Sequence, residues 1–139
     1  MEEYDVIADT ETITMKLYEQ RILKYLEIES NKATKAAAAG SSVTPWYLFA
    51  ALQSMHVPFP EEIPEYDATC SQMLGDSSGS KEYLTSRKRY CSMVLLTDEV
   101  IGNIMDYLRD NGLYDNTLVV FTTDNGGETA RVCPLWKRV

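Results

Sequence analysis

The chain has 139 residues, of which 45% are hydrophobic, and this length and apolar content are those of one ordinary globular domain. Acidic residues outnumber basic ones by 21 to 13, and the resulting net charge of -8 repels nucleic-acid phosphates and anionic membrane surfaces. No apolar run approaches the roughly 18–20 residues of a membrane-spanning helix, and the acidic start MEEYDVIADTETITM does not match a signal peptide. We therefore expect no nucleic-acid partner, no membrane span and no signal peptide in this chain.

Cysteine and histidine usage limits the kinds of metal site that the chain can form. The three cysteines, Cys70, Cys91 and Cys133, match neither a zinc pattern nor a dense disulfide framework, and they leave the redox compartment open. His56 is the single histidine, so a histidine cluster around a metal is excluded within this polypeptide. A site for a hard cation, built from oxygen ligands, remains open.

The first third of the chain predicts a helix, a linker and a strand. Between residues 10 and 29, apolar side chains recur at spacings of three and four, which indicates an amphipathic helix. Residues 30–44 are small, polar and low in complexity, and we interpret them as a surface linker. The nearly continuous apolar run at 45–52, PWYLFAAL, is typical of a strand buried on both faces of a parallel sheet.

The rest of the chain predicts a long loop, a helix and a second strand. Residues 53–80 contain several prolines and the sequence GDSSGS, and we expect a loop. An apolar stripe at 81–110 predicts a helix that Gly112 ends, and TLVVFT at 117–122 predicts another buried strand. This order indicates an α/β fold with mainly parallel strands flanked by helices. Two strands do not make an independent sheet, so we expect part of a larger domain.

The segment VVFTTDNGGE at 119–128 has two interpretations. Asn125-Gly126 is a favourite dipeptide of hairpin turns, but a hairpin needs a second alternating strand, and the residues after Glu128 supply none. Alternatively, Asp124 and Asn125 lie at the carboxyl end of a parallel strand, where ligands bind in α/β sheets. Their side chains offer hard oxygen ligands for Ca²⁺ or Mg²⁺.

His56 also has two interpretations. A single histidine is more often a surface or structural residue than a functional one, but this one follows the predicted strand at 46–52 and opens a loop bounded by prolines. If both strands lie in one sheet, His56 and the Asp124–Asn125 pair emerge at the same rim.

Two long stretches resemble a known family. The sequence WYLFAALQSMHVP at 46–58 is similar to a segment of the type I sulfatases, and RYCSMVLLTDEVIGNIMDYLRDNGLYDNTLVVFTTDNGGE at 89–128 resembles the helix, connection and Asp-Asn-Gly-Gly strand end of the same enzymes. The likeness is greatest to arylsulfatase B-like enzymes. It implies a partial alkaline-phosphatase-like fold and a sulfuric ester hydrolase. By position, Asp124 and Asn125 match the family's calcium ligands, and His56 matches its catalytic, sulfate-binding histidine.

The same resemblance shows what this sequence lacks. In sulfatases a cysteine within Cys-x-Pro-Ser-Arg becomes the formylglycine nucleophile, and none of the three cysteines here begins that motif. The early Asp-Asp pair that completes the calcium shell is also missing. We therefore expect residues 1–139 to be a partial sulfatase catalytic domain with a truncated end at 129–139, inactive by itself.

Two other functions compete with this expectation. One is a non-catalytic, acidic α/β interaction protein derived from the sulfatase scaffold, and the other is a phosphatase or phosphodiesterase of the same superfold. The resemblance further implies a sulfate ester as substrate, with sulfated sugars as the usual theme, and a lysosomal or secreted location.

Overall fold

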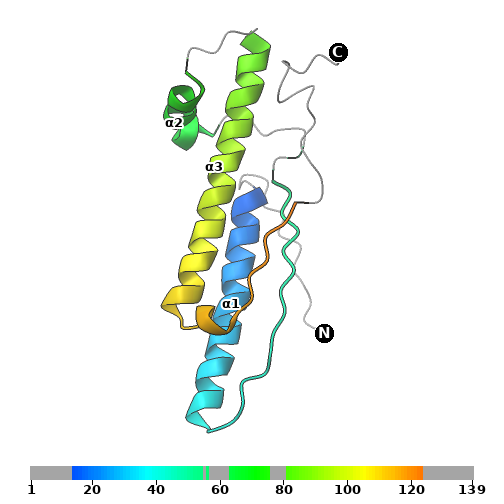
Figure 1. Ribbon diagram of the computed structural model, residues 1–139, viewed down its shortest axis with the longest axis vertical. Helices are drawn as coiled ribbons and strands as arrows, with labels where there is room; N and C mark the ends of the chain where they lie inside the picture. The colour runs from blue at the N-terminus through cyan, green and yellow to red at the C-terminus, as the bar shows by residue number, and fades with distance from the viewer. Residues whose placement is uncertain (1–13, 55, 57–62, 76–80, 124–139) are drawn as a thin grey trace. The chain divides into compact units, whose positions relative to one another are not determined.

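The computed structural model describes residues 14–54, 56, 63–75 and 81–123. It contains three α-helices, α1 (Thr14–Ala38), α2 (Pro64–Leu74) and α3 (Lys81–Asp110), followed by the short 3-10 helix η1 (Tyr114–Asn116) (Figure 1). The chain divides into two units, residues 1–52 and 53–139. The first unit contains α1, and the second contains the other three helices.

Helix α1 confirms the expected amphipathic helix over its described residues. Its buried residues recur at alternating spacings of four and three, which places them on one face of a helix; they are Met15, Glu19, Ile22, Leu26 and Glu29. The two buried carboxylates are each paired with a lysine one turn away, Glu19 with Lys16 at 3.1 Å and Glu29 with Lys32 at 2.7 Å. These ion pairs offset the cost of removing charged groups from water.

The helix continues to Ala38 and so covers the first part of the stretch at 30–44 that we interpreted as a linker. Alanine has the highest helix propensity, and the run of alanines extends α1 without needing a large anchoring side chain. The helix ends where Gly40 adopts a φ of 63°. The amide of Ser41 then donates to the carbonyl of Ala36 at 2.9 Å, and that of Gly40 to Ala37 at 3.1 Å, which is a Schellman motif.

The segment at 45–52 is extended, but it is not the buried strand that we expected. Tyr47 is 81% exposed and Phe49 is 74% exposed. The segment lies against α1 of its own unit, where the rings of Tyr25 and Trp46 meet edge to face with centroids 6.2 Å apart. The prediction of a buried strand at 45–52 is therefore wrong.

Helix α2 lies within the stretch at 53–80 that we expected to be a loop. Its first residue is Pro64 and the preceding Ile63 has an extended backbone with φ -91° and ψ 106°. Proline is favoured at the first helical position because its missing N–H needs no partner there. The proline that we took as a loop signal therefore starts a helix.

Helix α3 confirms the helix expected at 81–110. Its buried side chains lie at helical spacing; they are Ser92, Met93, Leu96, Thr97, Val100 and Leu108. Gly112 ends it, as expected, with a φ of 66°. The amide of Leu113 donates to the carbonyl of Leu108 at 2.9 Å, and both side chains are buried. Hydrophobic residues at these two positions are the usual companions of a Schellman motif.

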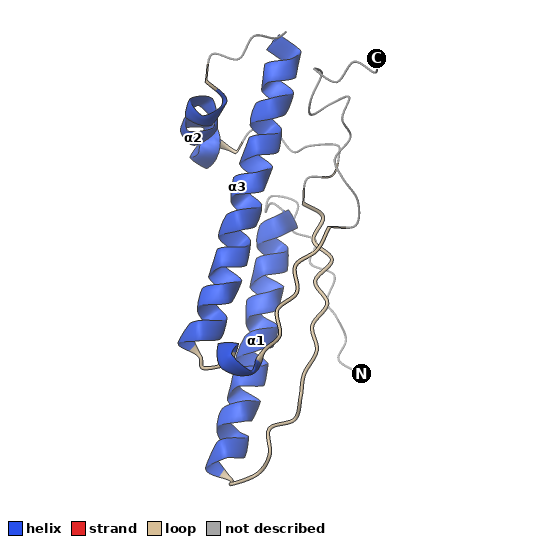
Figure 2. Ribbon diagram, viewed as in Figure 1, coloured by secondary structure: helices blue, strands red, loops and turns tan. Residues whose placement is uncertain are grey.

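The second expected strand, at 117–122, is likewise not a strand in the described part of the chain. Thr117 has strand-like angles, φ -124° and ψ 122°, but Leu118, Val120 and Phe121 are exposed. No residue in the described part of the chain is assigned to a strand (Figure 2). The expected α/β fold, with mainly parallel strands flanked by helices, is therefore wrong for these residues. An extended segment becomes a strand only when a neighbour pairs with its backbone, and two such segments are too few for an independent sheet.

Candidate functional site

His56 is exposed and lies two residues after an anchor to α3. The hydroxyl of Ser54 contacts the hydroxyl of Thr97, and Thr97 is buried. Thr97 donates its own proton to the carbonyl of Met93 at 2.7 Å. Because a threonine hydroxyl has one proton to donate, Ser54 is the donor in the contact with Thr97. The backbone just before His56 is thus held to a buried position on α3.

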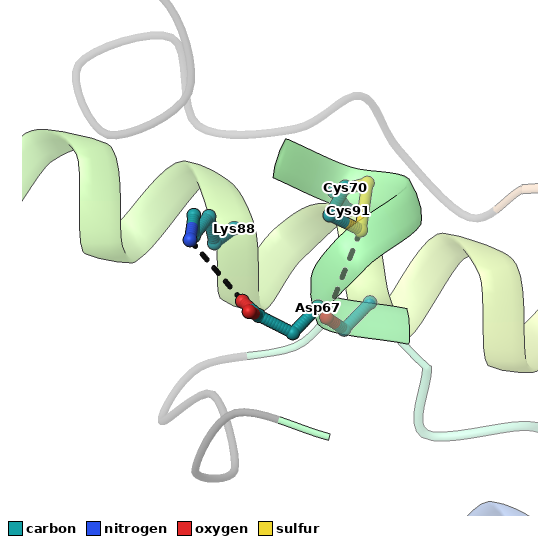
Figure 3. Close-up of a disulfide and its surroundings, with 5 residues drawn as sticks. Asp67, Cys70, Lys88 and Cys91 are labelled. Carbon is teal, nitrogen blue, oxygen red and sulfur yellow. Dashed lines mark hydrogen bonds and ion pairs between the residues drawn. A yellow bond between two sulfur atoms is a disulfide. The ribbon is translucent and has the colours of Figure 1, made fainter. Parts of the chain in front are cut away.

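The chain is anchored to α3 again after His56. Ile63 is buried and leads directly into α2, which contacts α3 (Figure 1). Cys70 of α2 and Cys91 of α3 form a disulfide, with Cα atoms 5.8 Å apart, and Lys88 of α3 forms an ion pair with Asp67 of α2 at 3.1 Å (Figure 3). Ser54 before His56 and α2 after it therefore both contact α3.

The other two residues of the expected site, Asp124 and Asn125, lie outside the described residues. The choice between a hairpin turn and a metal site at 119–128 stays a prediction for the same reason, because it depends on residues after Thr123. The expected proximity of His56 to the Asp124–Asn125 pair is likewise a prediction.

The described part of the chain supplies few grouped ligands for a metal ion. No group of three or more His, Cys, Asp or Glu residues that could hold a metal ion occurs within the described residues. A carboxylate and an amide oxygen, as at Asp124 and Asn125, are ligands that suit Ca²⁺, but this cation takes 6–8 oxygens. These two residues therefore fit calcium chemically and would supply only part of its shell.

The disulfide between Cys70 and Cys91 was not foreseen from the sequence. The two cysteines are 21 residues apart, and their pairing depends on α2, which we expected to be a loop. A helix that begins at Pro64 and has Cys70 on its buried face would have indicated this pairing. None of the helices that the structure describes combines the length and the apolar composition of a membrane span.

Comparison with known proteins identifies the family. The family model described as Sulfatase matches residues 4–135. The chain is 33% identical over 85 residues to an N-acetylglucosamine-6-O-sulfatase of Bacteroides thetaiotaomicron, with 54% of this chain and 15% of that protein covered. It is 25% identical over 122 residues to arylsulfatase J of Mus musculus, with 86% and 17% covered. It is 34% identical over 82 residues to the N-acetylgalactosamine-6-sulfatase of Homo sapiens, with 59% and 13% covered.

The chain thus spans less than a fifth of the length of these relatives. No solved structure matches it significantly. The family model, in contrast, covers nearly all of the sequence and includes His56, Asp124 and Asn125 in its range. The resemblance found in the sequence is confirmed at the level of the family. The chain belongs to the sulfatase family.

Proposed function

We propose that this chain is part of a sulfuric ester hydrolase, to which it contributes calcium-binding and sulfate-binding residues. The observation that carries the proposal is the family match over residues 4–135, within which the TTDNGG sequence at 122–127 supplies the oxygen ligands. Asp124 and Asn125 would hold Ca²⁺, which would supply positive charge to neutralise the oxygens of a sulfate ester. His56 donates a hydrogen bond to the same sulfate group near the leaving oxygen.

The covalent step requires a formylglycine nucleophile, which this sequence does not encode. As its hydrated aldehyde, this group would attack sulfur through one hydroxyl while the sulfur–oxygen bond to the alcohol breaks and the alcohol leaves with a proton. Loss of the proton from the other hydroxyl would then restore the aldehyde and expel sulfate. None of Cys70, Cys91 and Cys133 begins the Cys-x-Pro-Ser-Arg motif. We therefore expect no turnover of an aryl sulfate by the chain alone, even with calcium and a formylglycine-generating enzyme present.

The substrate that the proposal favours is a sulfate ester of a sugar. Two of the similar proteins are by name sulfatases of N-acetylated amino sugars, and this supports the same class for the protein to which this chain contributes. By family resemblance the protein functions in the lysosome or outside the cell.

Binding of sulfate in the presence of calcium tests the proposal directly. His56 is the single histidine of the chain, so its imidazole signals in a nuclear magnetic resonance spectrum are unambiguous. We expect inorganic sulfate to shift these signals when calcium is present and to shift them much less without it. Calcium affinity should be weak, with a Kd of about 10⁻³ M, because two protein ligands leave most of the shell to water.

Two variants with the same change of charge separate a site from general electrostatics. Asp124→Asn removes the negative charge of one proposed calcium ligand and leaves an amide oxygen, and Asp98→Asn removes the charge of an exposed carboxylate in the middle of α3. We expect the calcium-dependent sulfate shift of His56 to weaken strongly in the first variant and to persist in the second. Equal responses in the two variants would contradict the proposed site.

A second function, binding of a protein partner by a non-catalytic relative, is favoured by one observation. Leu118 is 90% exposed and Phe121 is 73% exposed, and an apolar surface of this kind marks interaction sites. Sedimentation velocity over a range of concentrations tests it: association that is lost on Phe121→Ser and unaffected by Asp124→Asn would favour this function over the sulfatase contribution.

A further inference from the structure

Helix α2 has few features that stabilise it as an isolated helix. It is 11 residues long, and isolated helices shorter than about 12–15 residues are marginal in water. Ile63 at its N-cap makes no side-chain capping hydrogen bond. Cys70 is its one buried residue, whereas Met73 is 68% exposed. The helix therefore depends on contacts with α3.

Helix α2 contacts α3 through polar side chains near the surface and through a disulfide. The Asp67–Lys88 pair has side chains that are 47% and 33% exposed, and the hydrogen bond from Tyr66 to Glu99 is also exposed. Exposed polar contacts of this kind contribute little, because water competes for the same groups. The disulfide joins Cys70 to Cys91. Cys70 is completely buried, and its sulfur also lies 3.8 Å from the hydroxyl of Ser92.

We propose that oxidation of Cys70 and Cys91 is the step that folds α2 onto α3, and that it thereby adds a fixed point after His56 to the one at Ser54. The disulfide acts as a redox-dependent brace. In the oxidised form Ser54 before His56 and α2 after it both contact α3, and in the reduced form the Ser54–Thr97 contact remains. Cys70 and Cys91 are positioning residues. The part of this inference that concerns His56 rests on the proposed function, and the part that concerns α2 does not.

The chemistry of the brace is thiol–disulfide exchange. A disulfide oxidant, such as oxidised glutathione, accepts two electrons: the Cys70 thiolate forms a mixed disulfide, and the Cys91 thiolate then attacks it and releases the second reduced thiol. The two protons leave with the two reduced thiols, so atoms and electrons balance. Disulfides of this kind form in secretory and extracellular compartments, which fits the location proposed above.

The first test measures whether the pair forms and whether α2 depends on it. The full-length chain carrying Cys133→Ser leaves Cys70 and Cys91 as its only cysteines. After refolding with glutathione, we expect neither thiol to react with iodoacetamide, and both to react after reduction. Hydrogen exchange of the amides at 64–74 should accelerate by at least about tenfold on reduction. The amides at 100–110 of α3 serve as the internal reference and should change little.

A second variant tests the same dependence of α2 on the disulfide without a reducing agent, in case reduction perturbs the whole chain. Cys70→Ser with Cys91→Ser replaces both sulfurs by hydroxyls of similar size, and it should exchange at 64–74 like the reduced protein under all redox conditions. Reactive thiols in the oxidised sample, or equal exchange of α2 in the oxidised and reduced samples, would overturn the brace.

The His56 signals test the remaining part. We expect the imidazole resonances to shift or broaden on reduction, in the absence of calcium and sulfate. If α2 loosens and these signals stay unchanged, the brace does not position His56. This outcome is distinguishable from failure of the proposed function, which appears as a missing response of the oxidised protein to sulfate.

Discussion

Helices α2 and α3 belong to the same unit but are stabilised by different means. Helix α3 has 30 residues, buries six side chains at helical spacing and ends in a Schellman motif with buried hydrophobic residues. Helix α2 has 11 residues and one buried side chain, and that side chain is half of a disulfide. Burial along a face distributes stability over many residues, whereas a cross-link concentrates it in one bond. The two helices should therefore respond differently to substitution.

The largest effect is expected in the core of α3. Leu96 is 1% exposed, and Leu96→Ala should lower the free energy of unfolding by about 2–5 kcal/mol, because it removes buried apolar area and leaves a cavity. Urea unfolding followed by circular dichroism measures this. Val94→Ala, at a position that is 38% exposed on the same helix, is the control and should cost far less. Similar losses of unfolding free energy in both variants would mean that the buried face of α3 does not stabilise it.

The next effect concerns the cross-link. Replacing Cys70 and Cys91 by serine should lower the free energy of unfolding by about 3 kcal/mol, because the loop that the disulfide closes is 21 residues long and its closure restricts the unfolded chain. The same double variant compared with the reduced protein should show almost no difference. If the variant is as stable as the unmodified chain under oxidising conditions, the disulfide does not stabilise α2, and the proposed difference between α2 and α3 is wrong.

Two glycines, one within α3 and one just after its end, sharpen the comparison, because replacing each by alanine should change the stability in opposite directions. Gly112 has a φ of 66° with nothing within 4 Å of an added Cβ, so Gly112→Ala should cost about 1 kcal/mol through backbone strain alone. Gly102 lies within the helix, also with nothing within 4 Å, and Gly102→Ala should stabilise by roughly 0.5–1 kcal/mol. Thermal unfolding measures the stability of both variants. A change of stability in the same direction in both would contradict the positive-φ glycine at the end of α3.

The smallest effect is expected at the exposed ion pair between the helices. Asp67→Asn should cost less than about 1 kcal/mol, because both partners are partly in water. The loss should shrink further at high salt, since salt screens exposed charges. Unfolding at low and high ionic strength measures the difference. A cost that approaches that of the disulfide would show that the polar contacts hold α2.

The candidate site also has two kinds of residue, those that local motifs reveal and those that only the folded chain brings together. The sequence indicated His56, Asp124 and Asn125 through motifs that span a few residues each, and the comparisons confirm the family to which those motifs belong. The sequence did not indicate Ser54 and Thr97, whose contact joins residues that are 43 positions apart, or the disulfide that fastens α2. Motifs record residue types along the chain, whereas anchors of this kind are made by residues that meet only after folding.

Local sequence by itself determined the course of α3 and its end, because helical hydrogen bonds join residues four apart and a glycine with positive φ stops them wherever it occurs. The apolar runs at 45–52 and 117–122 predicted strands from the same kind of local preference, and neither run is a strand in the described part of the chain. Whether an extended run becomes a strand, and whether Cys70 meets Cys91, was decided by tertiary structure. A strand needs a neighbour for its backbone, and a disulfide needs two distant Cα atoms within a few ångströms.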